Sequence, residues 1–205
     1  MHSYVRKVFF DGYIFNVLPD VYEPAEDSFL IAENLAVNNG ESVLDMGTGC
    51  GVLGIVAAKK ASMVLAVDIN PHAVCCARKN AKSNKVEDKM FFLVGDLFSP
   101  IKVDVKFNLI TFNAPYLPSE PCESETWIDR AWAGGINGRE VIDRFICSAA
   151  KYLERNGRVL LLQSTLADVS RTLELLQASG LEASILLKHD LPFFETLVLI
   201  EARKS

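Results

Sequence analysis

VLDMGTGCG, residues 43–51, carries a short apolar strand pattern directly into three glycines at alternate positions. Glycine tolerates positive φ angles and lets a ligand lie against bare backbone, so this stretch predicts a binding loop at the end of a strand. Residues 49–54 also fit the pattern GxGxxG. The glycines alone therefore leave open a site for a dinucleotide and a site for S-adenosylmethionine.

Strand and helix patterns alternate outward from this loop. Strands are predicted at residues 42–46, 62–68, 90–94, 107–112 and 158–163. Helices are predicted after Pro24 and at residues 51–60, 71–84, 137–155 and 166–179. Such alternation indicates a parallel sheet covered on both faces, with ligands outside the carboxyl ends of its strands.

Both ends of the chain depart from this alternation. Residues 181–188 and 195–202 form two last strand patterns joined by a short link, so they should be antiparallel. Near the start, the runs 4–10 and 13–18 flank Asp11-Gly12, a dipeptide typical of hairpin turns. We therefore expect an α/β fold: a short N-terminal β-hairpin, then a doubly wound, mostly parallel, seven-stranded sheet with a C-terminal antiparallel hairpin. This Rossmann-like arrangement is that of class I methyltransferases and differs from a dinucleotide-binding domain.

The composition is that of an ordinary globular chain. It has 205 residues, half of them hydrophobic, and a net charge of −5. We expect one domain over residues 1–205, and the negative charge argues against a direct nucleic-acid substrate. No signal peptide or membrane-spanning run is present, which favours a cytoplasmic location. The five cysteines form no CxxC pair and the three histidines lack metal-ligand spacing, so we expect reduced thiols and no metal site.

Acidic residues stand at the ends of the first three strands of the parallel sheet. Asp45 lies at the mouth of the first, where its carboxylate would repel a pyrophosphate but could neutralise a methionine ammonium group. Asp68 ends the second strand, where either cofactor would place ribose hydroxyls. After the third strand, Asp96 could accept a hydrogen bond from an adenine amino group and Leu97 could contact the base. Their equivalent positions at three successive strand ends argue against a loop-capping role for each.

The fourth strand ends in FNAPYLP, residues 112–118. An amide or base NH₂ group is a poor nucleophile because its lone pair is delocalised, and two acceptors holding both hydrogens would aim that lone pair at a methyl donor. Asn113 can supply one acceptor through its side chain. The main-chain carbonyl of Ala114, kept extended by Pro115, can supply the second, while Tyr116 stacks on the planar group.

These motifs resemble a known family. The glycine loop, the strand-end acids and the Asn-x-Pro-Tyr loop are similar to those of amino-methyltransferases with the signature Asn/Asp-Pro-Pro-Tyr, and most of all to HemK-type release-factor glutamine methyltransferases of the archaeal and eukaryotic branch. Two further segments carry this resemblance, VYEPAEDSF at residues 21–29 and AWAGG followed by GREV at residues 131–141. The likeness extends over about residues 20–200.

The resemblance implies S-adenosylmethionine as cofactor and the glutamine of a Gly-Gly-Gln motif in a class I release factor as methyl acceptor. It implies cofactor binding by Ser28, Asp45, Gly47, Gly49, Asp68, Asp96, Leu97 and Asn113. The chain departs from the family at Ala114, where the family has proline, and since that position contributes a backbone carbonyl we expect activity to survive. Trp127 and Trp132 could line a substrate groove or pack in the core, with Arg130 and Arg139 contacting backbone or phosphate.

Residues 90–94, Met-Phe-Phe-Leu-Val, are apolar on both faces, although the third strand of this fold is an edge. The resemblance implies that a small Trm112-like zinc-binding activator protein covers Met90–Val94; the chain's own helices are the alternative. The sequence alone leaves two other functions open: a nucleic-acid N6-adenine methyltransferase, which needs the same acceptors, and an NAD-binding oxidoreductase or module.

Overall fold

The computed structural model describes residues 5–120 and 126–205. The chain divides into two compact units, residues 1–101 and 102–205. The expectation of a single domain therefore stays a prediction. Tyr4, at the start of the first expected strand, and Cys122 lie outside the described residues.

The strands match the expected sheet. Seven of them run in the order β5-β4-β3-β6-β7-β9-β8, and β1 and β2 form a separate two-stranded sheet. Pairing is parallel for β3 with β4, β4 with β5, and β6 with β7, whereas β9 is antiparallel to both β7 and β8. The mostly parallel sheet with a closing antiparallel pair is therefore confirmed.

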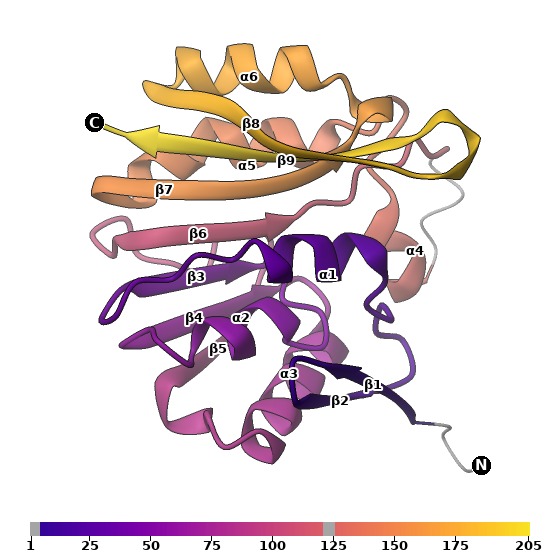
Figure 1. The fold of residues 1–205 in the computed structure, drawn as a ribbon, viewed down its shortest axis with the longest axis vertical. Helices are drawn as coiled ribbons and strands as arrows, with labels where there is room; N and C mark the ends of the chain where they lie inside the picture. The colour runs from indigo at the N-terminus through magenta and orange to yellow at the C-terminus, as the bar shows by residue number, and fades with distance from the viewer. Residues whose placement is uncertain (1–4, 121–125) are drawn as a thin grey trace. The chain divides into compact units, whose positions relative to one another are not determined.

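The first unit holds the hairpin and the first three parallel strands. Its elements are β1 (Arg6–Phe10), β2 (Tyr13–Val17), α1 (Glu26–Glu33), β3 (Ser42–Met46), α2 (Val52–Ala57), β4 (Met63–Asp68), α3 (Pro71–Ser83) and β5 (Met90–Val94). Asp11 and Gly12 turn the hairpin with φ angles of 45° and 80°, as the dipeptide predicts. Figure 1 shows the hairpin beside α3, where Asn80 Oδ1 accepts a hydrogen bond of 2.9 Å from the Asn16 N–H.

The second unit holds the rest of the sheet. Its elements are β6 (Phe107–Asn113), α4 (Trp127–Trp132), α5 (Glu140–Ala149), β7 (Leu153–Ser164), α6 (Val169–Ala178), β8 (Leu181–Asp190) and β9 (Thr196–Lys204). Helix α5 packs against α6, and α6 lies along β8 (Figure 1). The rings of Phe112 on β6 and Phe145 on α5 lie 4.7 Å apart in the core.

Two details of the second unit differ from the expectation. The helix expected at residues 137–155 is shorter. The α-helix α5 is followed by one 3-10 turn, η3 (Ala150–Tyr152), and β7 already begins at Leu153, which pairs with Phe107. The pairing is irregular there: Asn156 takes a left-handed φ of 61° and Gly157 follows, so the register changes before Leu109 meets Arg158. The short helix α4 was not expected.

The cysteines occupy two kinds of environment. Cys50 and Cys76 are buried, and burial raises the pKa of both thiols, which keeps them protonated and unreactive. Cys75 and Cys147 are exposed free thiols. Among the described residues, no helix combines the length and apolar character needed to cross a membrane.

Candidate active site

The glycine loop leaves β3 in a left-handed path. Gly47, Gly49 and Gly51 have φ angles of 65°, 56° and 94°, which side chains larger than glycine rarely adopt. The Thr48 N–H donates to the Val67 carbonyl at 3.0 Å and the Gly51 N–H to the Thr48 carbonyl at 2.8 Å, so the loop is fixed against the end of β4. No described atom would lie within 4 Å of a Cβ at Gly49. This side of the loop can accept a ligand against its backbone.

Asp45, near the end of β3, is buried beneath this loop. Its side chain is buried, and Oδ2 accepts hydrogen bonds from Thr48 Oγ1 at 2.6 Å and from the Gly54 N–H at 3.0 Å. A Cβ at Gly54 would come within 2.9 Å of the same oxygen, so glycine is needed for α2 to approach β3. The carboxylate therefore shapes the loop directly; its predicted contact with a methionine ammonium group stays a prediction.

Asp68, at the end of β4, holds the loop from the neighbouring strand. Its Oδ2 accepts the Gly49 N–H and its Oδ1 the Asn70 N–H, both at 2.9 Å. Burial raises the pKa of this carboxyl above the usual aspartate value, although the backbone N–H groups of Asn70, Gly49 and Ile69 partly oppose that effect. The charged form has backbone donors on both oxygens and lies beside the open face of Gly49.

Asp96 and Leu97 follow β5, whose end lies next to the end of β4 that carries Asp68. The Gly95 N–H donates to the Asp68 carbonyl at 2.9 Å, which places the two strand ends side by side. Both residues are half-buried, and Leu97 has a φ of 48°, which is unusual for a leucine. Strained backbone of this kind concentrates at binding sites. The structure thus brings Gly49, Asp68 and Asp96 together, as the strand-end pattern predicts.

Ser28 stands in the first turn of α1 and is held by Asp27, a residue of the motif VYEPAEDSF for which the sequence predicted no role of its own. Asp27 Oδ1 accepts hydrogen bonds from the Ser28 N–H at 2.6 Å and from its hydroxyl at 3.2 Å. The Tyr22 hydroxyl donates to both carboxylate oxygens of Asp27, at 3.1 and 3.2 Å. The sequence VYEPAEDSF therefore builds a small polar cluster that orients Ser28.

In the second unit, β6 ends at Asn113 and the predicted catalytic loop begins. Asn113 pairs with Leu162 of β7, and the Ala114 N–H donates to the Leu162 carbonyl at 3.3 Å. Asn113, Pro115 and Tyr116 are half-buried, whereas the Ala114 side chain is buried. The loop is thus tied to β7 at its first step and keeps part of its polar and aromatic surface accessible.

The helix α4 is joined by backbone contacts to the residue that follows this loop. The Leu117 N–H donates to the Trp132 carbonyl at 3.0 Å, and Leu117 and Ala133 form an isolated parallel bridge. Trp127 and Trp132 are half-buried, and α4 has no buried residue, so the tryptophans are not core residues. The guanidinium of Arg130 lies 5.1 Å from the centre of the Trp127 ring. Arg139 is buried and contacts backbone carbonyls, so its expected alternative contact with phosphate is wrong.

Comparison with known proteins finds methyltransferases, as this geometry indicates. Residues 21–128 match the family model described as the methyltransferase small domain. A putative protein N5-glutamine methyltransferase of Methanocaldococcus jannaschii is 41% identical over 191 residues, which cover 92% of this chain and 95% of the relative. Methyltransferase HEMK2 of Homo sapiens is 34% identical over 200 residues and covers 91% of each chain. Among solved structures, the E. cuniculi Mtq2-Trm112 complex, responsible for the methylation of the eRF1 translation termination factor, matches with a TM-score of 0.67 and 26% identity over 91% of this chain and 99% of that chain.

A parallel sheet closed by an antiparallel pair, with a glycine loop and acids at successive strand ends, defines a class I methyltransferase. The sequence identity to the two relatives above shows which family within this class the chain belongs to. The chain belongs to the methyltransferase small domain family and, within it, to the HemK-type protein glutamine methyltransferases. The NAD-binding alternative suggested by GxGxxG is therefore set aside.

Proposed function

We propose that the chain transfers a methyl group from S-adenosylmethionine to the side-chain amide nitrogen of the glutamine in the Gly-Gly-Gln motif of a class I release factor. The observation that carries the proposal is the loop at the end of β6, where Asn113 and the buried Ala114 are tied to β7 and Tyr116 is partly accessible. The names of the M. jannaschii relative and of the Mtq2-Trm112 complex support the same reaction.

The residues of the first unit fit the cofactor. Asp68 would accept the ribose hydroxyls, Asp96 would accept the adenine amino group, and Leu97 would contact the base. Gly47 and Gly49 would let the methionine part lie against backbone, which the free space in front of Gly49 allows. The bound cofactor supplies an electrophilic methyl group on a sulfonium. Ser28 and the Asp45-shaped loop would complete its binding site, and Asn113 is a further predicted contact.

The loop of the second unit would activate the acceptor. Asn113 Oδ1 and the Ala114 carbonyl would each accept one amide N–H, which favours a pyramidal nitrogen whose lone pair points at the methyl group. Tyr116 would stack on the planar amide, and Trp132 would border the substrate. Orientation of this kind can contribute several kcal/mol, within the roughly 7–11 kcal/mol attributed to full positioning.

The alanine at position 114 is compatible with this role. A proline there would have no N–H, whereas Ala114 donates to the Leu162 carbonyl at 3.3 Å. The bond to β7 can replace some of the rigidity that proline gives its relatives, while the backbone carbonyl remains the proposed acceptor. We therefore expect the chain to be active with alanine at this position.

We also propose that a Trm112-like, zinc-binding activator protein covers strand β5. This strand is terminal in the sheet order, and Phe91 and Val94 are 55% and 52% exposed. The chain's own α3 covers part of the strand, since Arg78 lies over the Phe92 ring at 5.6 Å. An exposed apolar edge is a poor surface for an isolated chain. The partner named in the Mtq2-Trm112 complex supports this assignment.

A release-factor substrate fits a cytoplasmic location, because translation termination takes place there. We further propose that residues 1–205 act as one methyltransferase domain, since the M. jannaschii relative matches 92% of this chain in one alignment.

A methyl-transfer assay tests the proposed acceptor. The substrates are the release factor, the same factor with the glutamine of Gly-Gly-Gln replaced by alanine, and RNA and DNA of the same source. We expect radioactive methyl label on the unaltered factor alone. Label that persists on the altered factor would exclude this glutamine, and label on RNA or DNA would favour the adenine methyltransferase alternative.

A further inference from the structure

The segment 133–139, here called the clamp, lies against the predicted amide-binding loop through backbone contacts. The Gly134 N–H donates to the Leu117 carbonyl at 2.8 Å, and the Ser119 N–H donates to the Gly135 carbonyl at 2.9 Å. The Gly135 N–H donates to Ser119 Oγ at 3.2 Å. These hydrogen bonds join the end of the loop to a segment that lies well beyond it in the sequence.

Gly138 brings the clamp against Tyr116 itself. Its φ is +71°, and a Cβ built there would overlap the Tyr116 carbonyl oxygen and lie 3.1 Å from the carbonyl carbon. A Cβ at Gly134 would likewise come within 2.7 Å of the Gly138 backbone. Only hydrogen atoms fit at these two positions, so the distance between the clamp and Tyr116 is fixed by the absence of side chains.

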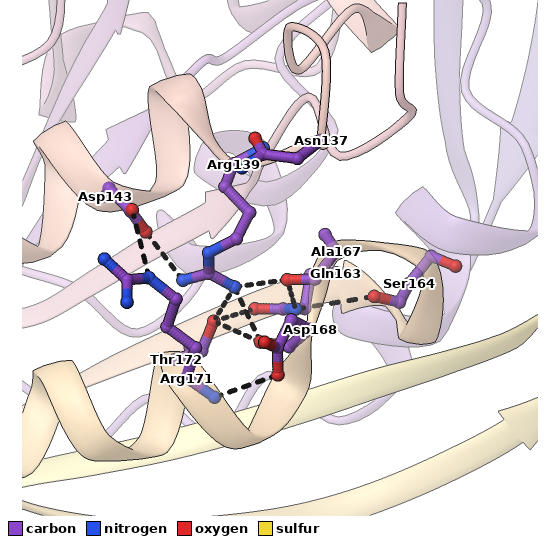
Figure 2. A network of polar contacts seen from close by, with 9 residues as sticks. All are labelled: Asn137, Arg139, Asp143, Gln163, Ser164, Ala167, Asp168, Arg171 and Thr172. Atoms are coloured by element: carbon purple, nitrogen blue, oxygen red, sulfur yellow. Dashed lines mark hydrogen bonds and ion pairs between the residues drawn. The ribbon is translucent and has the colours of Figure 1, made fainter.

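Arg139 fixes the other side of the clamp. The residue is 3% exposed, and Nη1 donates to the Ala167 carbonyl, to the Asp168 carbonyl at 2.6 Å and to Thr172 Oγ1 at 3.0 Å. Nη2 donates to Asp143 Oδ1 at 2.6 Å, which supplies the opposite charge (Figure 2). A guanidinium has a rigid planar set of donors, so this arrangement holds the Arg139 backbone in one place.

The same contacts reach the end of β7. Thr172 Oγ1 donates to Gln163 Oε1 at 2.6 Å, and Gln163 Nε2 donates to the Ala167 carbonyl at 3.2 Å (Figure 2). Gln163 and Thr172 are fully buried. A continuous set of buried polar contacts therefore runs from β7 and α6 through Arg139 to the backbone beside Tyr116.

We propose that Gly138 and Arg139 are positioning residues for the methyl-accepting amide. Gly138 sets how far the loop of Asn113 and Tyr116 extends from the clamp, and Arg139 keeps the clamp from moving away. This inference rests on the proposed function, because it assumes that this loop binds the amide. It assigns the role to two residues that need not touch substrate or cofactor.

The test compares Gly138→Ala with Gly180→Ala. Gly180 has a φ of +81° and no described atom within 4 Å of a built Cβ, so both variants introduce the same backbone strain but only one displaces the loop. A displacement of about 1 Å can reduce transfer about a hundredfold. We expect that loss in kcat for Gly138→Ala, with a much smaller fall in affinity for S-adenosylmethionine, and wild-type kcat for Gly180→Ala. Equal kcat in the two variants would overturn the role of Gly138.

Thr172→Val tests the Arg139 side without removing the buried charge. It takes away one acceptor from Nη1 and the donor to Gln163. We expect a smaller fall in kcat, again with cofactor affinity affected much less, and faster hydrogen exchange at the Gly134 and Ser119 amides, whose hydrogen bonds join the clamp to the loop. Unchanged exchange and kcat would refute the coupling.

Hydrogen exchange also separates this inference from the proposed function. If the wild-type chain binds S-adenosylmethionine but transfers no methyl group to release factor, the proposed acceptor is wrong. The clamp is then judged by the Gly134 and Ser119 amides, which donate the hydrogen bonds between clamp and loop. Faster exchange of these amides in Gly138→Ala than in Gly180→Ala supports the clamp, and equal exchange overturns it.

Discussion

Replacing the exposed apolar residues of β5 should weaken binding of the activator protein. Phe91 and Val94 are 55% and 52% exposed in the isolated chain, so Phe91→Ser with Val94→Ser removes surface that a partner would bury. The side chains contribute little to the fold in their exposed half. Serine also removes their buried half, which by the same reasoning stabilises the fold by about 2 kcal/mol in total. The double variant should therefore fold but melt about 4–8 °C below the wild type, and binding is compared at a temperature at which both are folded.

The expected size of the effect follows from the exposed fractions. Fully burying a phenylalanine or valine side chain stabilises by about 1.5–3 kcal/mol, so burying the exposed half of each contributes about 1 kcal/mol. The two together give about 2 kcal/mol. Since 1.4 kcal/mol corresponds to a tenfold change, the dissociation constant should rise roughly thirtyfold.

Titration calorimetry with a purified Trm112-like protein measures this constant. Phe9→Ser is the matched control, because Phe9 is 68% exposed on β1, which belongs to the separate two-stranded sheet of the same unit. We expect the control to bind like the wild type. An unchanged constant for the double variant, or equal weakening by the control, would refute β5 as the binding surface. A lone chain that is monodisperse, stable and fully active would refute the need for a partner.

Three further predictions concern the cofactor, the amide and the domain. Affinity for S-adenosylmethionine should fall on acidification with a midpoint above about 3.9, the usual aspartate pKa, because burial raises the pKa of Asp68 and its neutral form loses an acceptor. The folding stability of the unliganded chain depends on pH in the opposite direction. The raised pKa of Asp68 adds folding stability at pH values below its unfolded-state pKa, and this stability is lost as the pH rises through its folded-state pKa. Calorimetry across pH checks the affinity, with Asp68→Asn expected to be weaker and pH-independent; a flat wild-type profile contradicts this role. Asn113→Ala should abolish methyl transfer while cofactor affinity falls much less, and equal loss of both would mean that Asn113 mainly binds cofactor. A single domain should unfold in one calorimetric transition, whereas two separate transitions would show independent units.

Local patterns were sufficient for much of the fold and for part of the site. Asp11-Gly12 predicts the hairpin turn, and Pro71 predicts the start of α3, where Asn70 caps the helix by accepting the His72 N–H at 2.9 Å. The glycines after β3 and the acids after β4 and β5 predict a ligand-binding edge. These features depend on backbone angles and strand alternation, which neighbouring residues determine.

Other features depend on partners distant in the sequence. The residues next to Asp45 and Asp68 do not predict how deeply each carboxylate is buried. In the structure Asp68 lies beside the open face of Gly49, whereas Asp45 is buried under the loop and accepts the Gly54 N–H. The early start of β7 required its irregular pairing with β6. The sequence also left open whether Trp127 and Trp132 pack in the core or line a groove, and the structure shows them half-buried on α4.

The sequence by itself determined the order of the strands and of the helices other than α4, the glycine loop and the Asn-Ala-Pro-Tyr loop, because these follow from local backbone preferences. Only the tertiary structure decided that Arg139 is a buried anchor and that Gly138 touches Tyr116. The physical reason is distance along the chain: Ala167 is 28 residues from Arg139, and only folding brings its carbonyl to the guanidinium.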